Sequence, residues 1–292
     1  MVRAPTLPRD PLRVSPFGQR LHQWRSRWGL SQLDLASRAG TTPRYLSFVE
    51  TGRARPGRDL VLRLAAALDV PLRECNAWLV GAGLAPEFPD RDMADDAMQT
   101  LRLVLDKVLA MHEPYPAWVI AQPLRFVASN SAAEALFPGM CELLPEAIVD
   151  LWYGPGPLRD MVENWPDVLR AGLATLRREA ARTADARLDE LVKRAETHLK
   201  SIPKPDNTMG AESPLVCARL KIDGRVVSTT TAVMRFDAAM DVTAADLRVE
   251  LLFPADDESD AFFKSLASSS VVMAARIPAH NVGGAANNGS ER

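Results

Sequence analysis

The sequence of 292 residues is poor in cysteine and contains no motif that holds a metal ion or a cofactor. Its 3 cysteines, Cys75, Cys141 and Cys217, lie far apart in the chain. This spacing matches neither a zinc site nor the disulfide framework of a small secreted domain. We therefore expect these cysteines to be small apolar side chains in the protein core, without a metal or redox role.

Long apolar segments are also missing. No uncharged apolar run approaches the about 18 residues that a transmembrane helix requires, and residues 1–10 lack the apolar core of a signal peptide. Apolar residues make up 47% of the chain and charged residues 25%, which is typical of a globular protein. The sequence thus predicts a cytoplasmic protein without membrane contact, and its length suits two domains.

Catalytic motifs are absent as well. The 4 histidines are scattered, and His112-Glu113 is followed by Pro114, which disrupts the helical face that a zinc motif needs. Nucleophile-elbow, phosphate-loop and dinucleotide-binding patterns do not occur. The sequence therefore predicts neither an enzyme nor a bound metal or cofactor.

Charge is distributed unevenly, although the net charge of the chain is only −2. Residues 1–89 contain 13 Arg, no Lys and 7 Asp plus Glu, whereas the remainder is acidic. A basic region joined to an acidic region suggests a polyanion-binding module attached to a module of another kind.

The chain divides at residues 84–96, where glycine, prolines and an acidic run interrupt helical periodicity. Residues 14–83 carry helical patterns with very short connections and no alternating strand pattern. They predict an all-α N-terminal domain.

Residues 97–270 combine helical patterns with strands. Two hairpins are expected, one at Gln122-Pro123 and one at the Asp223-Gly224 turn, and a last strand is expected at 248–254. These elements predict an α+β domain with an antiparallel sheet and helices on one side. Residues 271–292 are expected to be a disordered tail.

One segment of the first domain is punctuated by caps and glycines. Ser31 predicts the start of a helix that ends at Gly40. Thr42 and Pro43 then predict a second helix that ends at Gly52. Two short helices joined by a glycine-containing turn form a helix-turn-helix. The side chains expected to face its core are Leu35, Ala36, Ala39, Leu46 and Val49.

The second helix of such a unit places its first residues in the DNA major groove. Arg44 is expected to contact guanine, because its guanidinium matches O6 and N7, and Phe48 or Pro43 to touch a thymine methyl group. Gln32 is expected to reach a phosphate. The full set of expected DNA-binding residues is Gln32, Thr42, Pro43, Arg44, Tyr45, Ser47, Phe48, Arg53 and Arg55.

Both domains resemble known families. Residues 31–56, SQLDLASRAGTTPRYLSFVETGRARP, closely resemble the xenobiotic-response-element (Cro/C1-type, XRE) helix-turn-helix domain, and the resemblance implies a structural role for Glu50. Four later segments, 112–120, 129–137, 163–191 and 228–259, are similar to the ligand-binding domain of MmyB-like transcription regulators. That resemblance implies a PAS-like domain with a mostly apolar pocket, which senses a small hydrophobic molecule of the long-chain fatty acid type.

Aromatic and apolar side chains are available to line such a pocket. The expected ligand-binding residues are Trp118, Phe126, Phe137, Trp152, Trp165, Val233, Phe236 and Phe253. An α+β core of this size needs similar side chains, so ordinary core packing is the alternative for each of them.

We therefore expect a DNA-binding transcription regulator that binds a double-stranded operator as a homodimer and senses a small hydrophobic ligand. Two alternatives stay open. In the first, the chain is a protein–protein interaction module without a small-molecule ligand. In the second, it binds DNA, and the second domain only makes the dimer.

Overall fold

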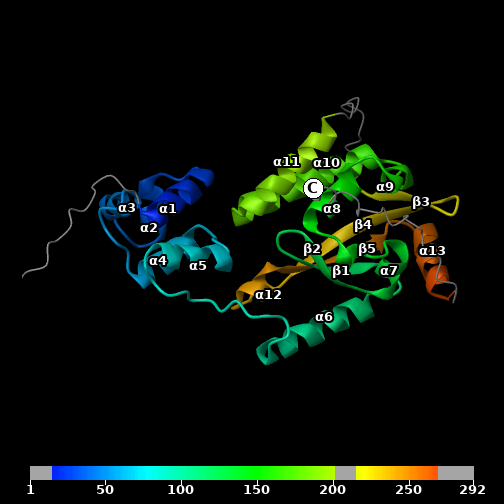
Figure 1. The fold of residues 1–292 in the computed structure, drawn as a ribbon, viewed down its shortest axis with the longest axis horizontal. Helices are drawn as coiled ribbons and strands as arrows, with labels where there is room; N and C mark the ends of the chain where they lie inside the picture. The colour runs from blue at the N-terminus through cyan, green and yellow to red at the C-terminus, as the bar shows by residue number, and fades with distance from the viewer. Residues whose placement is uncertain (1–14, 201–214, 269–292) are drawn as a thin grey trace, which may run out of the picture. The chain divides into compact units, whose positions relative to one another are not determined.

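The computed structural model describes residues 15–200 and 215–268, so the tail expected at 271–292 lies outside the described residues. The described residues form two compact units, whose helices and strands are labelled in Figure 1. The first unit holds residues 15–101, 176–189 and 236–247, and the second holds the other described residues.

The first unit begins with a helical bundle. Its helices are α1 (Pro16–Arg27), α2 (Gln32–Arg38), α3 (Pro43–Glu50), α4 (Arg58–Ala67) and α5 (Leu72–Gly81). Ser31 caps α2 by accepting a hydrogen bond from the backbone N–H of Asp34, and Thr42 caps α3 through the N–H of Tyr45. Gly40 follows α2 with a φ of 61°, which a residue with a side chain rarely adopts. The predicted helix-turn-helix is thus confirmed as α2 and α3.

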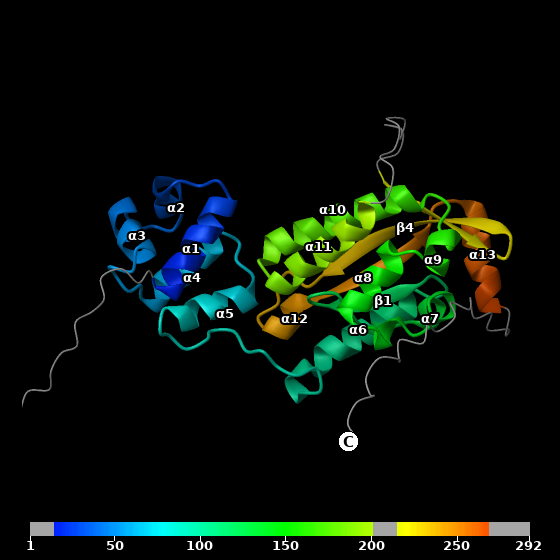
Figure 2. The same ribbon diagram turned by 45° about the horizontal axis from the view of Figure 1, so that its top comes forward.

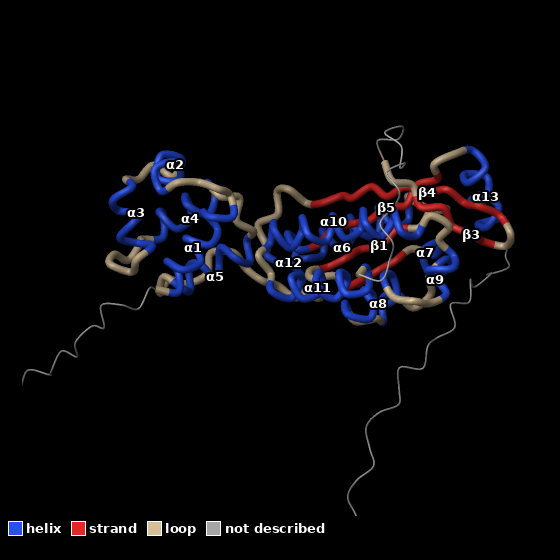
Figure 3. Tube along the Cα trace, turned by 90° about the horizontal axis from the view of Figure 1, so that it is seen from above, coloured by secondary structure: helices blue, strands red, loops and turns tan. Residues whose placement is uncertain are grey.

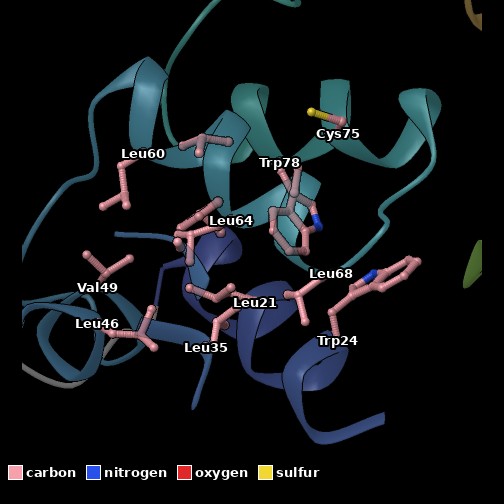
Figure 4. Packing of buried hydrophobic residues seen from close by; sticks show 14 of the residues in the cluster. Leu21, Trp24, Leu35, Leu46, Val49, Leu60, Leu64, Leu68, Cys75 and Trp78 are labelled. Carbon is pink, nitrogen blue, oxygen red and sulfur yellow. The ribbon is translucent and has the colours of Figure 1, made fainter. Parts of the chain in front are cut away.

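Leucines of α1, α2, α3 and α4 share one buried core with tryptophans of α1 and α5 (Figure 4). Phe17 and Trp24 of α1 pack edge-on against Trp78 of α5, with ring centroids 5.6 and 6.3 Å apart. The predicted core side chains are confirmed, since each is at most 1% exposed: Leu35, Ala36, Ala39, Leu46 and Val49. This packing fixes which side of α3 faces inward.

The first residues of the predicted linker belong to the bundle. Leu84 and Phe88 pack against its core. The Asn76 side chain of α5 donates a hydrogen bond to the carbonyl of Phe88 at 2.6 Å and accepts from the backbone N–H groups of Glu87 and Phe88, each at 3.0 Å. The chain therefore stays attached to α5 for several residues beyond the boundary expected at residue 84.

Two short helices also belong to the first unit, together with residues 176–189 of two longer helices described below. The short helices are the 3-10 helix η1 (Asp96–Met98) and α12 (Val242–Asp246). Asp241 caps α12, since its carboxylate accepts hydrogen bonds from the backbone N–H groups of Thr243 at 2.9 Å and Ala244 at 3.4 Å.

The second unit is built on a five-stranded sheet with the strand order β2-β1-β5-β4-β3 (Figure 3). The strands are β1 (Ala117–Ala121), β2 (Arg125–Ser129), β3 (Ala218–Ile222), β4 (Arg225–Arg235) and β5 (Leu247–Pro254). The pairs β1–β2, β3–β4 and β4–β5 are antiparallel. Asp223 and Gly224 join β3 to β4 with φ values of 50° and 74°, as a tight hairpin turn requires. Both predicted hairpins and the α+β class are confirmed.

Helices cover the sheet. They are α6 (Gln99–Met111), α7 (Ser131–Leu136), the 3-10 helix η2 (Met140–Glu142), α8 (Pro145–Tyr153), α9 (Pro157–Met161), α10 (Trp165–Thr183), α11 (Ala186–Leu199) and α13 (Asp257–Ser268). In Figures 1 and 2, α6 and α10 lie on opposite sides of the sheet. Residues 117–120 of β1 are all buried, although alternate side chains of a strand point to opposite faces. The expectation of helices on one side only is therefore wrong.

One buried amide joins three elements around β1. The side-chain oxygen of Asn130 accepts hydrogen bonds from the backbone N–H groups of Ala117 and Ala133, each at 3.0 Å. Its nitrogen donates to the carbonyls of Tyr115 at 2.8 Å and Leu109 at 3.3 Å. Asn130 thus connects the start of β1, the end of α6 and the first turn of α7.

Candidate DNA-binding surface and ligand site

The outer side of α3 carries an arginine stacked on an aromatic ring. Arg44 is exposed, and its guanidinium carbon lies 5.6 Å from the centre of the Phe48 ring, about one turn later in the helix. Tyr45 is half-buried against the bundle core and donates a hydrogen bond to the carbonyl of Arg55 at 3.3 Å. The guanidinium of Arg44 is thus supported and points outward, while Tyr45 anchors the loop that follows α3.

The other residues expected at DNA are found in the same stretch of chain. Thr42 and Pro43 are exposed in the first turn of α3, and Ser47 is half-buried. Arg53 and Arg55 are exposed in the loop between α3 and α4. We call this stretch the α3 surface, and its residues are Thr42, Pro43, Arg44, Ser47, Phe48, Arg53 and Arg55.

Gln32, the first residue of α2, is held by a buried carboxylate. Its amide nitrogen donates a hydrogen bond to Oε2 of Glu50 at 2.7 Å. Arg25 of α1 donates to the same carboxylate from Nε at 2.7 Å and from Nη2 at 3.1 Å, and Nδ1 of His22 lies 3.4 Å from it. An amide nitrogen carries two hydrogens, so Gln32 has a second N–H beside the one that Glu50 accepts, and Glu50 fixes the position of this amide.

Glu50 is only 6% exposed. Burial alone would raise the pKa of its carboxyl, but the hydrogen bonds from Arg25 and Gln32 and the charge of Arg25 outweigh burial and lower that pKa. The carboxylate therefore stays ionised and joins α1, α2 and α3, as the structural role implied for Glu50 requires.

Two positioning arginines were missed by the sequence analysis. Arg25 lies 25 residues before its partner Glu50. Arg63 of α4 donates a hydrogen bond to the carbonyl of Ala39, at the end of α2, at 2.9 Å. No local spacing links either pair, and the only hint was the presence of an acidic residue at the end of the second helix.

Four of the predicted ligand-site residues form a chain of rings in the second unit. The Trp118 ring of β1 lies 6.3 Å from the Phe126 ring of β2 and 5.9 Å from the Phe137 ring, measured between centroids. The Phe137 ring lies 5.6 Å from that of Trp152 in α8. We call these four residues the aromatic cluster. An apolar surrounding of this kind is typical of sites for small apolar ligands.

The other four candidates are not part of this chain of rings, although Trp165 lies next to it. Trp165 is buried beside α8, where its indole N–H donates to the carbonyl of Trp152 at 3.1 Å. Val233 is 49% exposed and Phe253 38% exposed, so neither lines a buried site. Phe236 belongs to the first unit, whereas the aromatic cluster belongs to the second.

The three cysteines are free thiols in different surroundings. Cys75 is buried, and this burial, followed by the charges of Glu87 and Glu74, raises the pKa of its thiol to about 11. Cys141 and Cys217 are only half-buried, so the expectation that all three lie in the core is wrong for these two.

In the described ranges 15–200 and 215–268, no three His, Cys, Asp or Glu side chains gather as a metal site requires. A search of the same residues also finds no helix with the length and apolar character needed to span a membrane.

The two domains, a helix-turn-helix bundle and an α+β domain with a buried aromatic cluster, are those of a ligand-responsive transcription regulator, a class that rests on two family matches and not on the fold alone. Residues 101–266, more than half of the chain, match the MmyB-like transcription regulator ligand binding domain, and residues 16–78 match a helix-turn-helix domain. The chain belongs to the MmyB-like transcription regulators, as both resemblances indicated. No curated protein matches the chain.

Proposed function

We propose that this protein is a sequence-specific operator-binding regulator, which acts as a homodimer under the control of a small apolar ligand of the fatty-acid type. One observation carries the DNA-binding part. The buried side of α3 is fixed by the bundle core, so Arg44 stands exposed on its outer side, supported by Phe48. The exposed cations Arg53 and Arg55 follow in the next loop, where they suit the DNA backbone.

The experiment for this part is selection of bound duplexes from a random pool, followed by titration of the selected duplex into the full chain. Arg44→Ala is expected to weaken binding by about 10- to 100-fold and to abolish a guanine preference at one position. Arg53→Ala is expected to weaken binding to all duplexes alike and to lower the salt dependence by about one counterion. Arg225→Ala, at an exposed arginine beside the β3–β4 turn, is the matched control and should bind as the wild type does.

Unchanged affinity and base preference in Arg44→Ala would refute the groove placement of α3. The protein–protein alternative makes a different prediction. An apolar protein contact would yield no selected duplex, and its affinity would depend little on salt, whereas DNA binding weakens steeply as salt rises.

The dimer follows from the small surface that a single helix-turn-helix buries on DNA. We expect two copies on half-sites about 34 Å apart. The ligand changes the affinity for the operator only if it binds one conformational state of this dimer more tightly than the other. Native mass spectrometry of the purified full chain should give a dimer mass, and a monomer mass would refute paired half-site binding.

For the ligand, the proposed contacts are the aromatic cluster, Trp118, Phe126, Phe137 and Trp152, with Trp165 beside it. A dimer that carries the added mass of an apolar molecule, released by organic extraction, is the expected result. A dimer without added mass that stays unchanged when fatty acids are supplied would leave this domain as a dimerisation module.

Three further proposals accompany this function. The domain boundaries that we propose are residues 14–83 and 97–270, joined by the linker 84–96, whose first residues pack against the bundle core. We place the protein in the cytoplasm, because its operator DNA would lie there, and assign it no catalytic activity.

A further inference from the structure

Within the described part of the chain, the indole nitrogen of Trp118 lacks the hydrogen-bond partner that the indole nitrogens of Trp78 and Trp165 have. Trp78 donates its indole N–H to Oε1 of Glu74 at 3.0 Å, and Trp165 donates to the carbonyl of Trp152 at 3.1 Å. Trp118 is 7% exposed, and its Nε1 is the one fully buried side-chain nitrogen or oxygen of the described residues that has no hydrogen-bond partner. Since buried polar groups are nearly always paired, this donor points to an acceptor that arrives from outside the chain.

The surroundings of this donor are aromatic. The rings of Phe126 and Phe137 flank Trp118 and are themselves 7% and 3% exposed. Trp152 lies beyond Phe137. An acceptor that reaches the indole N–H is therefore attached to an apolar molecule, because the rest of that molecule contacts aromatic carbon.

The charge of the acceptor follows from the same surroundings. An ionised carboxylate has several lone pairs to satisfy, and its desolvation among aromatic rings is costly unless charged or multiple donors compensate. An uncharged carbonyl oxygen, in contrast, is satisfied by one hydrogen bond from a single neutral N–H.

We propose that the Trp118 indole N–H is the hydrogen-bond donor for an uncharged carbonyl oxygen at one end of a long-chain aliphatic ligand, such as a ketone, an ester, an amide or an un-ionised fatty acid. This inference rests on the proposed function, because it assigns the polar contact of the same ligand site. It makes Trp118 the residue that distinguishes a carbonyl ligand from a plain hydrocarbon and from an ionised fatty acid.

The experiment uses the full chain and three probes of equal chain length: 2-decanone, decane and decanoate at pH 8. The wild type should bind the ketone about tenfold more tightly than the alkane, as one neutral hydrogen bond allows. With indole-¹⁵N tryptophan, one resonance should move downfield with the ketone and stay in place with the alkane. That resonance should be the one that is missing in Trp118→Phe.

Trp118→Phe keeps an aromatic ring and removes the donor, so ketone and alkane should bind to it equally. Trp152→Phe alters the same cluster without touching this donor and should keep the ketone preference. The comparison of probes on the wild type does not depend on either variant folding.

Equal binding of ketone and alkane to the wild type would overturn this inference but not the proposed ligand site. This result is expected if the indole N–H only faces an aromatic ring. Tightest binding of decanoate, with the same resonance shifted, would overturn the uncharged acceptor. Binding of none of the three probes would overturn the ligand part of the proposed function together with this inference.

Discussion

Replacing Glu50 by glutamine tests whether the charged network beneath the α3 surface holds the bundle together. Glu50→Gln keeps the shape of the side chain and removes the charge that two N–H groups of Arg25 and one of Gln32 contact. Breaking a buried charge pair by removing one partner costs about 3–5 kcal/mol. Glutamine keeps one acceptor oxygen, so we expect a loss of about 2–3 kcal/mol. This is a large part of a typical stability of about 5–15 kcal/mol.

The loss should depend on pH in a defined direction. The pKa of Glu50 in the folded protein lies below its ordinary value of 4.5. Ionised Glu50 therefore adds its full stabilisation above the unfolded-state pKa, and this stabilisation disappears as the pH falls through the folded-state pKa. The wild type and Glu50→Gln should differ most near neutral pH and converge in acid.

Native-state hydrogen exchange with mass spectrometry measures the loss of stability in the bundle itself. Peptides from α1 and α3 report the opening free energy of the bundle in the full chain. Asp59→Asn removes an exposed carboxylate in the first turn of α4 and should leave the protection nearly unchanged. Equal protection of the wild type and Glu50→Gln at pH 7 would refute the reasoning. So would a difference that persists unchanged into acid.

Three further predictions test other parts of the fold. The pKa of about 11 keeps the buried Cys75 thiol protonated, so iodoacetamide at pH 8 should label Cys75 more slowly than Cys141 or Cys217. Peptide mass spectrometry measures the labelling, and a result in which Cys75 is labelled first would contradict this prediction. In Gly18→Ala, the added Cβ would lie 2.4 Å from the carbonyl oxygen of Glu50, so we expect a loss of about 2 kcal/mol or more in denaturant unfolding. Gly57→Ala, at the N-cap of α4, meets no atom within 4 Å and should cost less, about 1 kcal/mol. Asn130→Ala removes four hydrogen bonds around β1 and should cost about 2–4 kcal/mol; thermal unfolding that matches the control Ser131→Ala would count against this role of Asn130.

The helix-turn-helix could be predicted from the sequence because each of its determinants acts over a few residues. Ser31 and Thr42 cap helices through backbone N–H groups three residues away. The apolar spacing within α2 and α3 selects the buried side of each helix, and the opposite side, with Arg44, follows from it. The Asp223-Gly224 hairpin is equally local, since its turn residues directly join the two strands that pair.

The ligand site could be predicted only as a set of candidates. Strand patterns show which side chains share a face, but they do not show whether a helix covers that face. Val233 and Phe253 therefore matched a lining pattern and are exposed, whereas both faces of β1 are buried.

By itself, the sequence determined the caps, the turns, the amphipathic faces and, through its family patterns, the order of a DNA-binding and a ligand-binding domain. The tertiary structure decided which distant groups meet, such as Arg25 with Glu50 and the rings of Trp118, Phe126 and Phe137. It also buried the indole N–H of Trp118 without a partner among the described residues. The physical reason is that capping and turn geometry are properties of short segments. The burial and pairing of a charge or a donor depend on every element that packs around it.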